Sequence, residues 1–579
     1  MVCLAAFGAV YIARDLVKTR DHLQQATLLT QRLRQQTMRG DLQAVTETLA
    51  LLSRETAGAR SDTGGTWWRL GLRSPVVGDD LQAVRTVTVA LDDFVREGLP
   101  PLVAAAKQFA PRTSKPQRAP FDLSRLQAAT SNLSKSHVAV RRGHERVAAI
   151  PTASLTTRVR TAVVELAADL DRATTLIGTA MRMATLLLTL LGADGPRTML
   201  VLFQNPAEVR ATGGMPGVFV VIRADRGTLD VIDQGTASAD LATFDHPVLA
   251  LDPSLEALYS ERMGIYPADV NLSPHFPTAA KLAREMYRRR SGRTVDGVLA
   301  TDPIALSYLL TALGPVRVPG GPELTAKNAV AVLLSDTYAR PGPLSQQDEY
   351  FLAAATATFE ALMSRPLEPA DLLDPLARAA RERRILFWSA DPVVQQAVSG
   401  TVLGGVLPAS DGAQPTVGVF LNDGSGAKLG YYLTQSAKVT VGSGCRADGR
   451  RGLKLRIVLG STAPKSGLPP YVLGLGLAGD PYTLRTIVAV YGSTGGVMDG
   501  VLLDGEPVSF GSGRDRRRPV GVVAVDVKPG TKRTLDVDLL TGVPRTGGDT
   551  TITPRLWMTP GVRPWTQSVQ SADGCPTTR

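Results

Sequence analysis

The stretch Met199–Arg223 constrains the fold of this chain more than any other. Two apolar runs, Met199–Phe203 and Val218–Ile222, flank a segment that is rich in polar residues and glycine. Short apolar runs bounded by Gly, Pro and Asn are typical of strands in a sheet covered on both faces. The sequence therefore predicts two buried strands joined by a polar turn that begins with residues 204–210.

The predicted turn carries charged and amide side chains, namely Asn205, Glu208 and Arg210, and Gly213 and Gly214 follow it. Glycine suits a backbone that needs positive φ or a close approach to a ligand, and arginine clamps phosphate or carboxylate through two parallel hydrogen bonds. These residues favour an anion-binding loop. A hairpin whose Glu208 and Arg210 are merely solvated explains them equally well, because no established motif matches the segment.

The string FQNPAEVRATGG (203–214) resembles the signature of domain-of-unknown-function family 4012, an uncharacterised family of bacterial cell-envelope proteins. The likeness continues through ADVNLSPHFPTAA (268–280), VDGVLATDPIALSYLLTALGPVRV (295–318), LTAKNAVAVLLSDTY (324–338) and NDGSGAKLGYYL (422–433). It covers roughly residues 196–435. The resemblance implies a protein that is anchored in the cell membrane, with most of the chain outside the cytoplasm.

Residues 295–318 are also distantly similar to the closing strand–helix–strand of LytR–CpsA–Psr phosphotransferases. Those enzymes move glycopolymers from polyprenyl-diphosphate carriers to the cell wall. The similarity implies catalytic roles for Arg210, Glu208 and Arg340, and a role for Asp233 in holding Mg²⁺, which is a possible cofactor. The chain departs from that family at Ala211-Thr212, where its Asp is absent, and it lacks the Pro-Arg-Asp element. These departures argue against metal binding and glycopolymer transfer, and they leave binding of a lipid or a phosphate group open.

A second group of residues is expected to bind the ligand around this loop. Its members are Asn205, Gly213, Gly214, Asp269, Asn271 and Asp302. Structural roles compete with binding for the last three. Asp302 precedes Pro303 and is a good helix N-cap, while Asp269 and Asn271 fit a turn.

The pattern of apolar residues changes along the chain and predicts a multidomain protein. Apolar residues at helical spacing predict a helical bundle or stalk over 15–195, which is either a spacer or a lid on the next domain. Strands that alternate with helices predict a central α/β mixed-sheet domain over 196–365, and 366–398 is expected to be an arginine-rich helical connector. From 399 to 579, short strands between Gly, Pro and Asp turns predict an all-β sandwich domain.

The N-terminal segment Val2–Ala13 is apolar but shorter than the roughly 20 residues that span a bilayer. We interpret residues 1–14 as the end of a membrane anchor, or alternatively as the apolar core of a secretory signal. Arg14, Lys18 and Arg20 follow it, and by themselves these positive charges would predict that the rest of the chain stays in the cytoplasm. The family resemblance implies that it lies outside the cytoplasm. Thr174–Leu191 is the nearest other apolar run, but it holds Arg182.

The chain of 579 residues has a net charge of +11. This charge suits an anionic membrane or wall polymer, and no nucleic-acid-binding motif is present, so no nucleic acid is expected as a partner. Three cysteines exclude a zinc cluster; Cys445 and Cys575 either form a disulfide or are free. Two functions remain open. One is binding or transfer of polyprenyl-phosphate-linked glycopolymers at Glu208–Arg210, and the other is a non-catalytic envelope scaffold that acts through the β-sandwich.

Overall fold

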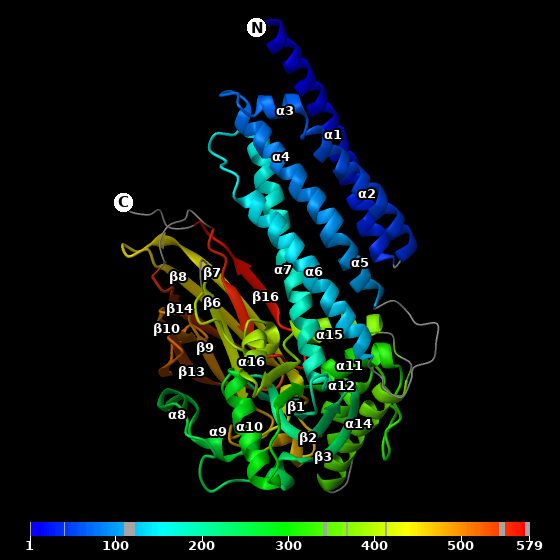
Figure 1. Ribbon diagram of the computed structural model, residues 1–579. Coiled ribbons are helices and arrows are strands. Elements are labelled where there is room, and N and C mark those ends of the chain that lie inside the picture. The colour runs from blue at the N-terminus through cyan, green and yellow to red at the C-terminus, as the bar shows by residue number, and fades with distance from the viewer. Residues whose placement is uncertain are drawn as a thin grey trace. The chain divides into compact units, whose positions relative to one another are not determined.

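The structure is a computed structural model (Figure 1). It describes residues 2–39, 41–108, 122–339, 344–365, 367, 369–411, 414–543 and 551–573. The chain forms two compact units. The first consists of Met1–Pro196 with Asp225–Thr228, and the second of Arg197–Ala224 with Leu229–Arg579.

The first unit is helical, which confirms the expected fold of the N-terminal region. Its helices are α1 (Val2–Met38), α2 (Leu42–Asp62), α3 (Thr66–Gly71), α4 (Gly78–Asp93), α5 (Leu99–Lys107), α6 (Leu123–Ala148) and α7 (Thr157–Leu190). Asp41 and Asp122 cap α2 and α6, because each carboxylate accepts a backbone N–H of the first helical turn. Arg60 of α2 donates to Asp92 and Asp93 of α4 at 3.0 and 2.6 Å, so charged pairs help to align these two helices.

Helix α7 is, within the described ranges, the one helix long and apolar enough to cross a membrane, judged by length and composition alone. Only 22% of its most apolar window is buried. In the sequence, the charge of Arg182 argued against a membrane span over this segment. In the structure, the Arg182 guanidinium donates to Thr179 Oγ1 on the same helix at 3.0 Å. Val2–Ala13, where the anchor was expected, forms the first part of α1. By length and composition α7 is a candidate span, and the anchor expected at residues 1–14 stays a prediction.

A five-stranded mixed sheet opens the second unit. Its strands are β1 (Arg197–Arg210), β2 (Gly213–Asp225), β3 (Thr228–Thr236), β4 (Gly297–Thr301) and β5 (Leu386–Ser389), in the order β3-β2-β1-β4-β5. Strands β1 and β4 are parallel, while β1 with β2 and β4 with β5 are antiparallel. The predicted α/β mixed sheet is thereby confirmed.

Two expectations about this sheet are wrong in detail. Residues 204–210 are not a turn: β1 continues to Arg210, and only Ala211 and Thr212 connect it to β2. The pairing is bulged between Asn205 and Val209, where Asn205 Oδ1 accepts the backbone N–H of Ala207. This local bond lets a polar, proline-containing segment remain in a strand. Likewise, the expected helical connector 366–398 contains β5, whose apolar residues complete the sheet beside β4.

Helices cover the sheet and connect its strands. They are α8 (Pro253–Tyr259), α9 (Arg262–Ile265), α10 (Phe276–Ser291), α11 (Pro303–Leu313), α12 (Ala329–Ala331), α13 (Thr337–Ala339), α14 (Leu344–Ser364), α15 (Pro369–Arg381) and α16 (Pro392–Ser399). The apolar face of α10 packs in the sheet core, where Phe276, Ala280 and Met286 are fully buried. That core fixes both ends of α10 relative to the strands.

The arginine run at the end of α10 holds a loop against the helix. Arg289 donates to the carbonyl of Val248, and Arg290 donates to the carbonyls of Leu241 and Thr243. Arg288 and Arg289 also pair with Glu285 at 2.8 and 3.0 Å. Hydrogen bonds from Arg288 and then Arg289 outweigh burial and lower the pKa of Glu285 from 4.5 to about 2.

Because the pKa of Glu285 is lower in the folded chain, its charge stabilises the fold above the pKa of an unfolded glutamate. This contribution is lost as the pH falls through about 2. We expect Glu285→Gln to reduce the free energy of unfolding by about 1 kcal/mol at pH 7, since its arginine partners are half exposed. The difference should shrink between about pH 4.5 and pH 2 in urea unfolding. Glu360→Gln, at an exposed position of α14, is the control and should show no such trend.

The C-terminal part of this unit is a β-sandwich, as expected. One sheet has the order β11-β10-β14-β8-β7-β16 and the other the order β12-β13-β9-β6-β15. The strands are β6 (Thr416–Asp423), β7 (Leu433–Cys445), β8 (Arg451–Ser461), β9 (Leu484–Tyr491), β10 (Val497–Leu503), β11 (Glu506–Pro507), β12 (Gly511–Asp515), β13 (Arg518–Val527), β14 (Lys532–Leu540), β15 (Arg555–Met558) and β16 (Thr566–Gln570), and α17 (Pro470–Leu473) lies between β8 and β9. Cys445 is disulfide-bonded, whereas its expected partner Cys575 lies outside the described residues.

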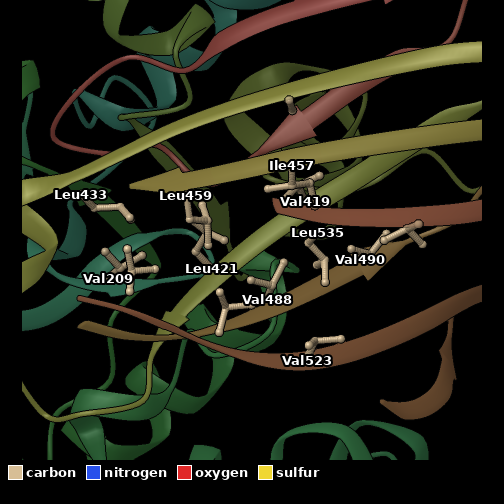
Figure 2. Packing of buried hydrophobic residues seen from close by; sticks show 14 of the residues in the cluster. Val209, Val419, Leu421, Leu433, Ile457, Leu459, Val488, Val490, Val523 and Leu535 are labelled. Atoms are coloured by element: carbon tan, nitrogen blue, oxygen red, sulfur yellow. The ribbon is translucent and has the colours of Figure 1, made fainter. Parts of the chain in front are cut away.

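Apolar side chains of both sheets meet in one core. Ile457 and Leu535 come from the first sheet, and Val419, Val488 and Val523 come from the second (Figure 2). Ile457 and Leu535 lie on strands whose buried and more exposed residues alternate, as a sandwich with one solvent-facing side requires. This core also contains Val209, which lies on β1 and so comes from outside the sandwich.

Candidate functional site

The end of the β1–β2 hairpin is inserted into the β-sandwich. Val209 packs in the sandwich core close to Leu421 and Leu433 (Figure 2). Ala211 lies on the opposite face of the second sheet, in a cluster with Phe420 and Tyr491. The hairpin that sequence analysis expected at a ligand therefore belongs to the junction between the mixed sheet and the sandwich.

Backbone groups at the tip of this hairpin bind side chains of the sandwich. The N–H of Ala211 donates to Asn422 Oδ1 at 2.9 Å, and the carbonyl of Ala211 accepts from Thr559 Oγ1 at 3.0 Å. The amide of Asn422 also donates to the carbonyl of Leu272 at 3.0 Å. A buried backbone group without a partner is costly, so these bonds fix the tip in one position.

Glu208 forms a buried ion pair with Lys428, with Nζ and Oε1 2.6 Å apart. Their side chains are 10% and 5% exposed. The ammonium group also lies 3.9 Å from the ring centre of Tyr471 and 5.0 Å from that of Tyr338. Burial, the largest single effect, would lower the pKa of Lys428, but Glu208 and Tyr471 together outweigh it and raise the pKa, so the lysine is charged.

Asn205 joins this ion pair to Tyr338. Its amide nitrogen donates to Tyr338 Oη at 2.7 Å and lies 3.4 Å from Glu208 Oε1. Burial, and then the charge of Glu208, raise the pKa of the Tyr338 phenol well above its ordinary value. The phenol is therefore neutral at physiological pH and acts as a hydrogen-bond partner.

Arg210 is paired with Asp269 rather than open to a ligand. Its Nε and Nη2 donate to Asp269 Oδ1 at 3.2 and 2.9 Å, and its Nη1 donates to the carbonyl of Val209 at 3.0 Å. The other carboxylate oxygen of Asp269 accepts two bonds from Arg262, at 2.7 and 3.0 Å. Arg210 is 8% exposed and Asp269 is 4% exposed. An anionic ligand would have to displace Asp269 from Arg210.

Gly213 and Gly214 permit the tight return of the hairpin. Gly213 has a φ of 141°, which side chains rarely adopt. A Cβ on Gly214 would lie 2.1 Å from the carbonyl carbon of Asn205, inside backbone atoms that cannot move aside. The side chain of Asn271 donates to the carbonyl of Gly214 and to Thr212 Oγ1, both at 2.8 Å. Glycine is therefore needed at position 214 because the backbone of Asn205 and Pro206 lies so close to it.

The remaining predicted site residues lie apart from this junction or outside the described chain. Asp233 accepts from the hydroxyl of Tyr287 at 2.7 Å. Asp302 caps α11 through Ala305 N–H at 2.7 Å and pairs with the buried Arg384 at 2.8 Å. Arg340 is outside the described residues. Throughout the described ranges, no group of three or more His, Cys, Asp or Glu side chains could hold a metal ion.

Lys428, Tyr338 and Asn422 complete the junction, and no role was predicted for them from the sequence. They lie in NDGSGAKLGYYL and LTAKNAVAVLLSDTY, strings that contributed to the family likeness. Lys428 is a lone basic residue within a glycine-rich, apolar string. A lysine buried among such residues needs a charged partner, so this pattern could have indicated a buried ion pair. Its partner could not be read from the sequence, because 220 positions separate the two residues.

Part of this junction lies in a segment that matches a protein-family model. Residues 194–338 match the family model described as "Protein of unknown function (DUF4012)". The match ends at Tyr338 and so contains Asn205, Glu208 and Arg210 but not Lys428. No curated protein matches the sequence.

Two solved structures of M1 zinc metallopeptidases are also similar to parts of this chain. One is a two-domain enzyme bound to L-arginine, and the other, from Deinococcus radiodurans, is bound to a Tyr-Ser-Ala substrate. Each shares 12% identity, covers 20% of this chain and 22% of its own, and has a TM-score of 0.12. The chain thus spans about a fifth of each metallopeptidase, and the likeness supports no conclusion about fold or function.

Proposed function

We propose that this chain is a non-catalytic binding or scaffold protein of the bacterial cell envelope, which is held at the membrane and acts through its β-sandwich. The observation that carries the proposal is that Glu208 and Arg210 are neutralised within the protein, by Lys428 and Asp269. Glu208 holds the sandwich on the mixed sheet through Lys428, and Arg210 holds the segment that carries Asp269 on the hairpin. The candidate membrane span α7 supports the location at a membrane. The envelope is what the sequence resemblance implies.

Glycopolymer transfer at the same residues would require a different arrangement. Arg210 would have to release Asp269 to bind a diphosphate, and Glu208 would have to leave Lys428 to approach a metal ion. If Glu208 left Lys428, the buried ammonium group would be an uncompensated charge, at a cost of about 3–5 kcal/mol. If Arg210 left Asp269, that carboxylate would keep only Arg262 as a partner. The geometry therefore favours the scaffold over the transferase.

The test compares Arg210→Ala with Arg223→Ala, an exposed position on the same hairpin. We expect Arg210→Ala to lower the free energy of unfolding by about 3 kcal/mol, because Asp269 then loses one of its two partners. Arg223→Ala should change it by less than about 0.5 kcal/mol. Urea unfolding of the full chain in mild detergent measures both.

The same samples are examined by native mass spectrometry with undecaprenyl phosphate. The proposal predicts no adduct that depends on Arg210. An adduct in the wild type and in Arg223→Ala that disappears in Arg210→Ala, with unchanged stability of Arg210→Ala, would overturn the scaffold proposal in favour of a carrier-lipid site.

A further inference from the structure

A cleft of about 350 Å³ opens in the second unit, away from the hairpin junction. Most of its lining residues come from the first turns of α10, from the whole of α16 and from the end of β5, and Figure 1 labels both helices. Its size falls within the range of about 300–1,000 Å³ that is typical of clefts for small molecules. None of the residues assigned to the ligand or to catalysis in the sequence lines it.

The walls of this cleft are mostly apolar. Pro277, Trp388, Ala390, Pro392 and Val406 line it. Trp388 is 6% exposed, and the Arg284 guanidinium lies 5.9 Å from its ring centre, so the indole is held in place. Such walls suit the apolar body of a ligand.

Polar side chains line the cleft on α16 and at the end of β5. Gln395 Oε1 accepts the backbone N–H of Ser389 at 2.8 Å, and its Nε2 donates to Ser399 Oγ at 2.9 Å. These bonds connect α16 to the end of β5. They hold the Gln395 side chain, which lines the cleft, in one position.

Positive charge faces the cleft without a described counter-ion. Lys281 lines it and is exposed, and no described carboxylate pairs with its ammonium group. Burial, followed by the charges of Arg516 and Lys281, lowers the pKa of the neighbouring His275 to about 3. His275 is therefore neutral, and Lys281 is the charged group that lines the cleft.

We propose that this cleft binds a small amphiphilic anion, in which one phosphate or carboxylate group is joined to an apolar body. Lys281 binds the anionic group, and the wall formed by Pro277, Trp388 and Val406 contacts the apolar body. The inference is independent of the scaffold proposal, because neither Glu208 nor Arg210 contributes to this cleft.

The test titrates phenyl phosphate into the full chain by isothermal calorimetry, with benzoate as the carboxylate counterpart. We expect saturable binding of one molecule, about tenfold weaker for inorganic phosphate and for benzyl alcohol, which each lack one half of the ligand. If benzoate binds as well as phenyl phosphate, a carboxylate is an equal ligand. If benzoate fails, the site requires phosphate.

Two substitutions separate the charge from the shape of the cleft. Lys281→Met should weaken phenyl phosphate binding about tenfold, whereas Lys327→Met, at an exposed position elsewhere in the unit, should not. Ala390→Phe should block binding by filling the cleft, with an unchanged unfolding midpoint. Absence of saturable binding, or equal affinities for Lys281→Met and Lys327→Met, would overturn the proposal.

Discussion

Lys428→Met is expected to lower the free energy of unfolding of the second unit by about 3–5 kcal/mol. Methionine keeps most of the apolar stem of lysine, so packing against Tyr471 and Tyr338 is largely retained. What is lost is the ammonium group 2.6 Å from Glu208, and the carboxylate is left buried and unpaired. Urea unfolding followed by circular dichroism in the β region measures the change.

The matched control is Lys465→Met, at an exposed lysine of the sandwich, which should change stability by less than about 0.5 kcal/mol. The double variant Glu208→Gln with Lys428→Met removes both charges and should recover at least half of the loss. Additive losses in the double variant would contradict a direct pair. A Lys428→Met variant as stable as Lys465→Met would do the same.

Gly214→Ala is expected to abolish cooperative folding of the second unit, with a loss above about 4 kcal/mol. The new Cβ would lie 2.1–2.3 Å from the backbone of Asn205 and Pro206. This backbone cannot shift without moving Val209 out of the sandwich core. Yield in the soluble fraction and thermal unfolding by circular dichroism measure the effect.

Gly217→Ala is the matched control, because it lies on the same strand and its Cβ would meet only the end of the Met215 side chain, at 3.8 Å. We expect Gly217→Ala to fold normally. Normal folding of Gly214→Ala would show that the hairpin does not hold this close approach, and the described junction would then be wrong.

The sequence predicts the classes of the elements well where apolar periodicity is strong. Long amphipathic helices such as α6 and short β-branched strands such as β9 follow directly from their own residues. The mixed sheet was also expected, except for β5. There, the short run Leu386–Ser389 lies between arginine-rich and helical segments, and so its pairing with β4 is decided by tertiary contacts.

The candidate site was predicted less well, for a physical reason. Glu208, Arg210 and two glycines have the same chemistry whether they face a phosphate or a second part of the same chain. The partners that decide between these alternatives are distant in sequence, since Lys428 and Thr559 both come from the sandwich. Asp302 was expected to bind the ligand, with a helix cap as the alternative, and the structure shows the cap, which could be read from the three residues that follow it.

The central claim is that the β1–β2 hairpin is a buried structural junction. Hydrogen exchange of the Ala211 amide in the full chain tests it most directly, with and without undecaprenyl phosphate. Because this N–H donates to Asn422 within the buried junction, we expect it to exchange only when the unit unfolds, at a rate that the lipid leaves unchanged. Rapid exchange that undecaprenyl phosphate slows would contradict the account and would identify the hairpin as a ligand site.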